Sequence, residues 1–206
     1  MKSKGKSPPN NKSEPVNNLD ELLNFLSPSQ RLHSQSVAVC SSIMAEYAKK
    51  FHWMFDYPIG IEPEIIAYLG GTCHDIGKLF LRILEEDYDK HPEVGAQILE
   101  KYKSNIFDNE EQAKTVIKIV RNHHERPDGS GFPDGLRAKD ISLAAGICAV
   151  ADSLDHLKKT NCNDMDILQH IRSQCGSAFC ESAVICFELA WSRLIEQYEK
   201  WNETAK

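Results

Sequence analysis

The chain contains 206 residues, of which 41% are hydrophobic and 26% are charged. This is the composition of an ordinary globular protein, and the length suits one domain with a substantial core. The formal net charge of −6 argues against a general nucleic-acid-binding protein, which usually needs a basic face. No apolar run approaches the roughly 18 residues of a membrane-spanning helix. We therefore expect a cytoplasmic protein whose partner is neither a nucleic-acid polymer nor a membrane.

Seven cysteines are spread along the chain without a CxxC pair. This spacing argues against a zinc ribbon or a thioredoxin-like motif. Most of the cysteines lie among apolar neighbours at helical spacing. They are therefore interpreted as buried thiols in a reducing compartment.

Residues 1–18 are rich in Lys, Ser, Pro and Asn, and we predict a disordered tail because they offer almost nothing to bury. From residue 19 onward apolar residues recur at helical spacing, so residues 19–206 are predicted to form one domain. No alternating strand pattern competes, and the predicted fold class is all-α. Helices are expected at residues 19–26, 29–51, 63–71, 92–102, 110–122, 141–158, 164–171 (with Asp164 as a candidate N-cap) and 179–201.

A turn-rich loop is expected at residues 126–135, where two prolines and three glycines occur within ten residues. It directly follows the histidine pair His123–His124. Loops of this composition beside charged groups often carry function. The loop is therefore a candidate part of a functional site.

The dipeptide His74–Asp75 is the first candidate for chemistry. Neighbouring helical residues point about 100° apart, so the pair can hold one ion from two sides, or Asp75 can span two ions. Lys78 lies further along the same predicted helix face, where a cation suits a phosphate oxygen. Gly77 leaves room for a ligand or another helix to approach closely. Alone, however, a single histidine on a helix is more often structural than functional.

Four further histidines and one aspartate strengthen the metal interpretation. His33 lies inside an apolar helix, His91 opens another helix, and His123–His124 closes a third. Asp152 follows the apolar run at residues 147–151, where a carboxylate is costly to bury unless it is paired or bound to a metal. A helix cap is the alternative role for Asp152, but no helix start signal surrounds it.

The order of these residues resembles the HD-GYP subfamily of the HD phosphohydrolases, over about residues 30–157. The segments that carry the resemblance are His33, HDIGK at 74–78, HP at 91–92, HHE at 123–125, DGSGFP at 128–133 and VAD at 150–152. The resemblance implies an HD-domain helical bundle with a buried metal site. It also implies a metal-dependent phosphodiesterase that hydrolyses cyclic dinucleotides, chiefly cyclic di-GMP.

The resemblance also implies a set of site residues. The implied metal ligands are His33, His74, Asp75, His91, His123, His124 and Asp152, with Asp75 bridging two ions. Lys78 is expected to touch the phosphate, and Asp128 and Lys158 are candidates for further substrate contacts. An imidazole-rich, carboxylate-bridged site favours iron or manganese, with zinc as an alternative, over magnesium.

The expected mechanism uses a hydroxide that bridges two divalent ions. Such a hydroxide is a nucleophile at neutral pH, because the metals lower the pKa of water. It would attack phosphorus in line, while the metals and Lys78 neutralise the developing charge. Asp75 and Lys78 are therefore the predicted catalytic residues.

Several departures from the family pattern bear on the number of ions and on the site. Ser29 stands four residues before His33, where three-metal members carry Glu, and this favours two ions. The connection between Asp75 and His91 is short, so we expect a short lid. Phe132 replaces the Tyr of the GYP segment, which removes one hydroxyl.

The region after the VAD segment departs most from the family. Residues 161–164 read Asn-Cys-Asn-Asp where family members usually supply Arg and Lys for a substrate phosphate. Lys158 and Lys159 can substitute for them, or they are solvated lysines at a helix end. We therefore expect cyclic di-GMP to be bound weakly or turned over slowly. His156 replaces a commonly small residue one helical turn beyond Asp152, where it can face the cleft.

Three hypotheses about function stay open. The HHE and GFP segments favour a cyclic dinucleotide phosphodiesterase. The missing arginine and the short lid favour a phosphohydrolase of another nucleotide or phosphate ester. The third hypothesis is a non-catalytic signalling module that binds a partner protein through the loop at residues 127–135. The complete ligand set of a two-metal site argues against this third hypothesis.

Overall fold

The computed structural model describes residues 16–52, 57–84, 88–160 and 162–204. Within these ranges the fold contains helices and no strand, which confirms the all-α prediction. The helices are α1 (Leu19–Leu23), α2 (Pro28–Lys50), α3 (Pro63–Cys73), α4 (Lys78–Leu84), η1 (Tyr88–Lys90), α5 (His91–Ile106), α6 (Glu110–Asn122), η2 (Ala138–Asp140), α7 (Leu143–Lys159), α8 (Asp164–Ser173) and α9 (Glu181–Thr204). Among the described residues, no helix combines the length and apolar character that crossing a bilayer requires.

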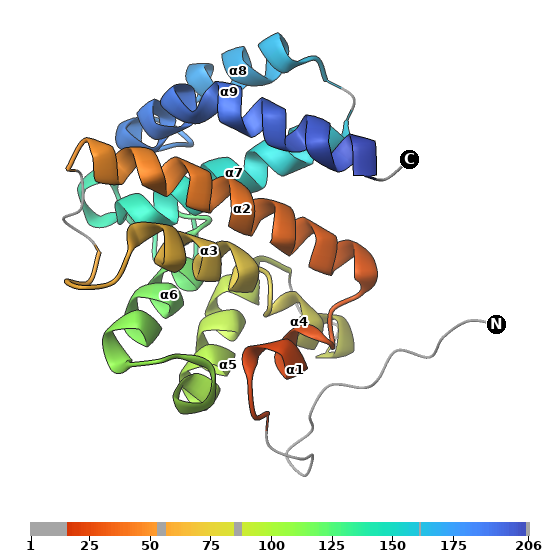
Figure 1. Cartoon of the computed structure of the whole chain (residues 1–206). Helices are drawn as coiled ribbons and strands as arrows, with labels where there is room; N and C mark the ends of the chain where they lie inside the picture. The colour runs from red at the N-terminus through yellow and green to blue at the C-terminus, as the bar shows by residue number, and fades with distance from the viewer. Residues whose placement is uncertain (1–15, 53–56, 85–87, 161, 205–206) are drawn as a thin grey trace.

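Helices α2 and α7 form the centre of the bundle (Figure 1). Helix α2 packs against α3, α7 and α9, and α7 also packs against α3, α6 and α8. Figure 1 shows α8 and α9 on one side of this central pair and α3, α5 and α6 on the other. Residues that are far apart in the sequence can therefore meet where α2, α3, α6 and α7 approach one another.

Polar side chains cap the starts of several helices. Ser27 and Gln30 form a reciprocal capping box at the start of α2. The predicted N-cap of α8, however, is wrong. The side chain of Asn163 accepts the hydrogen bond from the backbone N–H of Asp166 at 3.0 Å. Asp164 is instead the first helical residue, where its negative charge suits the positive end of the helix dipole.

A tight turn separates α3 from α4, so His74 and Lys78 do not share one continuous helix as predicted. Gly77 lies in this turn. A Cβ atom at this position would lie 2.1 Å from the backbone oxygen of His91, a distance that only glycine avoids. The close approach is thus made by another helix, α5, which is one of the two options that the sequence left open.

The first described residues pack against the domain. Of the tail predicted at residues 1–18, residues 1–15 lie outside the described part. Val16 is only 3% exposed, and its carbonyl accepts a hydrogen bond from the side chain of Asn105 at 2.7 Å. Asn18 caps the start of α1. The ordered domain therefore begins a few residues before Leu19.

The cysteines largely follow the expectation of buried thiols. Five of the seven are buried, and burial raises the pKa of each of these five thiols. Cys162 and Cys175 are exposed. All seven are free, as the absence of a regular framework in the sequence predicts.

Candidate metal centre

The structure brings the seven predicted ligands into one buried cluster at the centre of the bundle. They come from five places in the chain: His33 in α2, His74 and Asp75 in the turn after α3, His91 at the start of α5, His123 and His124 at the end of α6, and Asp152 inside α7. Six of the seven are buried, and His124 is partly exposed. Asp152 lies in the interior of α7, so the alternative role as a helix cap is wrong.

Three of these residues form what we call the α6 side of the cluster, namely His91, His123 and His124. The Nε2 atoms of His91 and His123 are 3.3 Å apart. The ring centroids of His123 and His124 are 4.2 Å apart. The Oδ1 atom of Asp75 approaches this group, 3.2 Å from Nε2 of His91.

Three further ligands form the α7 side, namely His33, His74 and Asp152, and Asp75 lies between the two sides. The Nε2 atoms of His33 and His74 are 3.3 Å apart, and Nε2 of His33 is 3.0 Å from Oδ1 of Asp152. The second carboxylate oxygen of Asp75, Oδ2, lies 3.5 Å from Nε2 of His74. The two oxygens of Asp75 therefore face the two sides of the cluster.

Backbone carbonyls orient three of the histidines in the same way. The Nδ1 atoms of His74, His91 and His123 each lie 2.7–2.8 Å from the carbonyl oxygen of the residue three positions earlier. A carbonyl can only accept, so each Nδ1 carries the proton and donates it. In a neutral imidazole the Nε2 lone pair is then free, and in these residues it points into the cluster.

His33 is oriented differently, by a carboxylate that the sequence analysis did not single out. Its Nδ1 atom lies 2.6 Å from Oδ2 of Asp155. Asp155 also accepts a hydrogen bond from the hydroxyl of Tyr198 at 3.2 Å and pairs with Lys159 at 2.5 Å. The signal for Asp155 was present in the sequence, because it is a second carboxylate in the apolar helix that contains Asp152.

The carboxylates show that the donor set fits divalent cations. Asp75 Oδ1 and Asp152 Oδ1 are buried, and neither accepts a hydrogen bond of acceptable geometry from the described residues. Leaving such an oxygen unsatisfied costs about 1–3 kcal/mol. Ligand atoms about 2.1 Å from a common ion lie roughly 3.0–3.4 Å apart, which matches the shortest separations on each side, 3.0–3.3 Å. A cation on each side would satisfy both oxygens.

The protonation of the cluster differs between its two sides. On the α6 side, burial lowers the pKa of His124 to about 4 and that of His123 well below its usual range, so both imidazoles are neutral near pH 7. On the α7 side, burial lowers the pKa of His33, but the nearby carboxylates of Asp152 and Asp155 outweigh it and raise the value to about 9. A metal ion there would replace this proton.

A cavity of about 400 Å³ opens beside the cluster. Its lining includes residues of the cluster, of the loop at 126–135 and of the segment before α9. The lining residues are His123, His124, Glu125, Arg126, Ser130, Phe132, Ala149, Asp152, Ser153, His156, Ala178 and Phe179. We call this cavity the cleft. Its position makes it the candidate substrate site.

The glycine-rich loop is held over the α6 side by Glu125. The buried carboxylate of Glu125 accepts hydrogen bonds from the backbone N–H groups of Asp134 and Leu136 at 2.6 and 2.7 Å. Phe132 stacks on the ring of His124 with 4.9 Å between centroids. The loop therefore forms one wall of the cleft. Its predicted role in binding a signalling partner stays a prediction.

Of the predicted substrate contacts, Lys78 lies at the cluster and the other two lie elsewhere. The Nζ atom of Lys78 is 2.7 Å from Oδ2 of Asp75. Asp128 is exposed and accepts hydrogen bonds from the backbone and the hydroxyl of Ser130, and it does not line the cleft. Its role in substrate binding stays a prediction.

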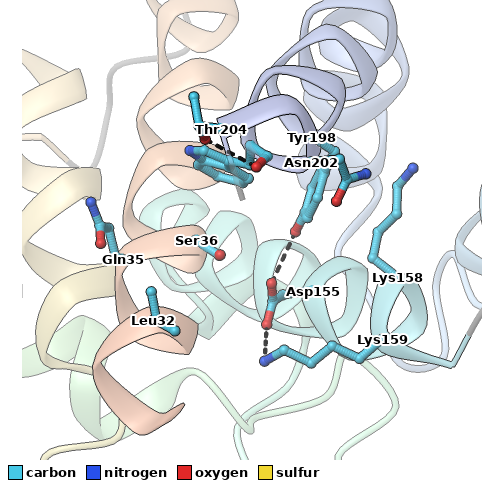
Figure 2. A pocket seen from close by; sticks show the side chains of 10 residues that line it. Leu32, Gln35, Ser36, Asp155, Lys158, Lys159, Tyr198, Asn202 and Thr204 are labelled. Atoms are coloured by element: carbon cyan, nitrogen blue, oxygen red, sulfur yellow. Dashed lines mark hydrogen bonds and ion pairs between the residues drawn. The ribbon is translucent and has the colours of Figure 1, made fainter. Parts of the chain in front are cut away.

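Lys158 points away from the cleft. It pairs with Asp164, and its ammonium lies 5.1 Å from the ring centroid of Tyr198. Figure 2 shows Lys158 and Lys159 beside a second cavity, of about 510 Å³, which Asp155 and Tyr198 also line. Asp155 thus lies between this second cavity and His33, and a substrate contact by Lys158 stays a prediction.

The structure adds Arg126 to the candidates. Arg126 follows the HHE segment directly and lines the cleft. Its Nε atom is buried without a hydrogen-bond partner, and no ion pair with a described carboxylate is formed. By contrast, Arg121 on α6 pairs with Asp134 at 2.7 Å. The sequence offered no signal that separates these two arginines, because their surroundings depend on how the loop folds.

Comparison with known proteins agrees with this geometry. Residues 32–157 match the HD domain family. The chain is 30% identical over 151 residues to a cyclic di-GMP phosphodiesterase from Pseudomonas aeruginosa, a match that covers 68% of this chain and 33% of that protein. It is 37% identical over 153 residues to a cyclic di-GMP phosphodiesterase from Thermotoga maritima, covering 66% of this chain and 37% of that protein.

A third relative has a different named substrate. The chain is 30% identical over 123 residues to the 3'3'-cGAMP-specific phosphodiesterase 2 of Vibrio cholerae, covering 52% of this chain and 22% of that protein. The chain spans only about a third of the length of the first relatives that it matches. These relatives confirm the predicted resemblance to the HD-GYP subfamily.

Proposed function

Because the chain belongs to the HD domain family, which is metal-dependent, we propose that it is a phosphodiesterase that hydrolyses a cyclic dinucleotide with two divalent transition-metal ions. The observation that carries this proposal is the position of Asp75. Its two carboxylate oxygens face two separate groups of histidine nitrogens, 3.2 and 3.5 Å away. A carboxylate in that position can bridge two ions, and two-ion sites favour phosphate-ester hydrolysis.

The cluster residues would hold the two ions in different ways. The α6 side would hold one ion through His91, His123, His124 and Asp75. The α7 side would hold the other through His33, His74, Asp152 and the second oxygen of Asp75. Bound ions would supply Lewis-acid charge and a water that is nucleophilic near neutral pH. The imidazole-rich donor set favours iron, manganese or zinc.

Two cationic side chains, those of Lys78 and Arg126, would bind the substrate. Lys78 places an ammonium beside Asp75, where it can neutralise charge on the scissile phosphate. Arg126 lines the cleft, and its Nε atom has no hydrogen-bond partner among the described residues; a guanidinium suits the second phosphate of a cyclic dinucleotide. Phe132 and Phe179 line the same cleft, and aromatic faces of this kind can stack on nucleobases.

A turnover panel tests the proposed function. Purified protein loaded with Mn²⁺ or Fe²⁺ is incubated with cyclic di-GMP, 3'3'-cGAMP, the linear dinucleotide pGpG and 4-nitrophenyl phosphate. We expect at least one cyclic dinucleotide to be opened to its linear form, in a reaction that a chelator abolishes. Turnover of the phosphomonoester alone would contradict the proposal and support the alternative of another phosphate ester.

Elemental analysis tests the metal centre separately. Protein purified without chelator should contain about two equivalents of iron, manganese or zinc per chain. A reproducible value near zero in a folded protein would contradict the proposed function. Such a value would also leave the non-catalytic signalling module as the better hypothesis.

A further inference from the structure

His156 is a donor at the cluster that the implied ligand set does not include. It lies on α7, four residues after Asp152, and lines the cleft. Its Nδ1 atom is 3.0 Å from Oδ1 of Asp152, and the side chain is 59% exposed. The centroid of its ring is 4.8 Å from that of His33.

The geometry points to a metal-binding role for this residue. His33, Asp152 and His156 each offer one ligand atom, and these three atoms lie within 4.8 Å of one another. Side chains four residues apart on a helix can bind one ion from the same face, as paired histidines do in zinc-binding helices. We propose that His156 is an additional ligand of the ion on the α7 side, beside His33 and Asp152.

The separations support a shared ion. Oδ1 of Asp152 lies 3.0 Å from Nε2 of His33 and 3.0 Å from Nδ1 of His156, as expected for neighbouring ligands of one ion. Nδ1 of His156 also lies 3.0 Å from the backbone oxygen of Asp152. That contact belongs to the tautomer that carries its proton on Nδ1. In the other tautomer the proton is on Nε2, and the lone pair of Nδ1 is free to bind an ion.

Metal titration of the metal-free protein tests this inference, which rests on the two-ion centre proposed above. Wild-type protein and His156→Ala are stripped with a chelator and titrated with Mn²⁺ and with Co²⁺ at fixed pH. We expect two equivalents for the wild type. In His156→Ala one ion should bind as before and the other about tenfold or more weakly. The visible spectrum of bound Co²⁺ should change only for the weakened ion.

A matched control is His170→Ala, since His170 is an exposed histidine on the neighbouring helix α8. It should leave both ions unchanged, and thermal unfolding of the metal-free variants should show an intact fold. Wild-type isotherms in His156→Ala would overturn the proposal. Loss of a third ion while two tight ions persist would also overturn it, because His156 would then serve a separate site.

The test is independent of turnover. A protein that hydrolyses no cyclic dinucleotide but loses affinity for one ion in His156→Ala would contradict the proposed function and support this inference. If the wild type turns over cyclic dinucleotides and His156→Ala binds both ions with wild-type affinity, the proposed function would be supported and this inference contradicted. A wild-type protein that binds fewer than two ions would overturn the two-ion centre and this inference together.

Discussion

The two sides of the metal cluster are built by different means. On the α6 side, backbone carbonyls three residues earlier orient His91 and His123, so the local helix geometry fixes these rings. On the α7 side a backbone carbonyl orients His74 in the same way, whereas Asp155 orients His33 from 122 residues away in the sequence. Asp155 is in turn held by Tyr198 and Lys159. Side chains and tertiary packing therefore fix the ring of His33.

The difference has a chemical consequence. Burial keeps the imidazoles of His123 and His124, on the α6 side, neutral near pH 7. The carboxylates of Asp152 and Asp155 outweigh burial at His33 and raise its pKa to about 9, so this ring on the α7 side is protonated near pH 7. We expect the α6 side to tolerate changes elsewhere in the fold, and the α7 side to depend on residues outside the ligand set.

Asp75→Asn should have the largest effect, because this carboxylate serves both sides. A neutral amide in place of the bridging carboxylate should weaken both ions and lower turnover by more than about a hundredfold, with little loss of fold stability. Metal content and turnover measured on the same sample check this. Asp128→Asn, at an exposed carboxylate, is the control and should retain both ions. A variant with wild-type metal content and rate would show that Asp75 is an ordinary aspartate.

Gly77→Ala should disturb the fold next to the α6 side. The added Cβ would lie 2.1 Å from the backbone oxygen of His91, so α5 must shift. We expect a loss of about 3 kcal/mol in the free energy of unfolding, measured by urea denaturation of metal-free protein. Gly146→Ala is the control, because its new Cβ meets only side-chain atoms at 3.2 Å or more. Equal stability of the two variants would contradict the steric argument.

Asp155→Asn should affect the α7 side alone. Residues that hydrogen-bond a metal ligand typically contribute tenfold to a hundredfold to metal affinity. One ion should therefore bind about tenfold more weakly, while the α6-side ion is unchanged. Calorimetric titration of the metal-free protein measures both. Tyr198→Phe removes only the hydroxyl that contacts Asp155 and should have a smaller effect. Equal weakening of both ions would remove the distinction between the two sides.

The smallest effect is expected for Arg126→Ala, which removes a cation from the cleft. Arg126→Ala should raise KM for a cyclic dinucleotide about tenfold, because a charged hydrogen bond contributes about 1.5–3 kcal/mol. The same variant should leave turnover of bis(4-nitrophenyl) phosphate, which has one phosphate, within about twofold. Lys158→Ala, which removes a lysine at the second cavity, should change neither. The reverse pattern would show that the substrate reaches the second cavity.

Much of the fold and of the ligand set could be predicted from the sequence. Apolar residues at helical spacing predict the helices because each helix must bury one face, and this pattern is local. The ligand set was implied by the resemblance to the HD-GYP subfamily, and Asp152 also stands out because a carboxylate in an apolar run is costly to bury. Gly77 could be identified as a point of close approach because glycine has no side chain. These are properties of short segments, and they do not require knowledge of the neighbours.

Tertiary structure decided which residues meet. Asp155 and Asp152 are both carboxylates of one apolar helix, yet Asp152 faces the cluster and Asp155 faces both His33 and the second cavity. Lys158 turns to Tyr198, and the Nε atom of Arg126 has no hydrogen-bond partner among the described residues. A side chain's partner depends on the crossing of helices that are distant in the sequence. Spacing along one helix therefore cannot determine it.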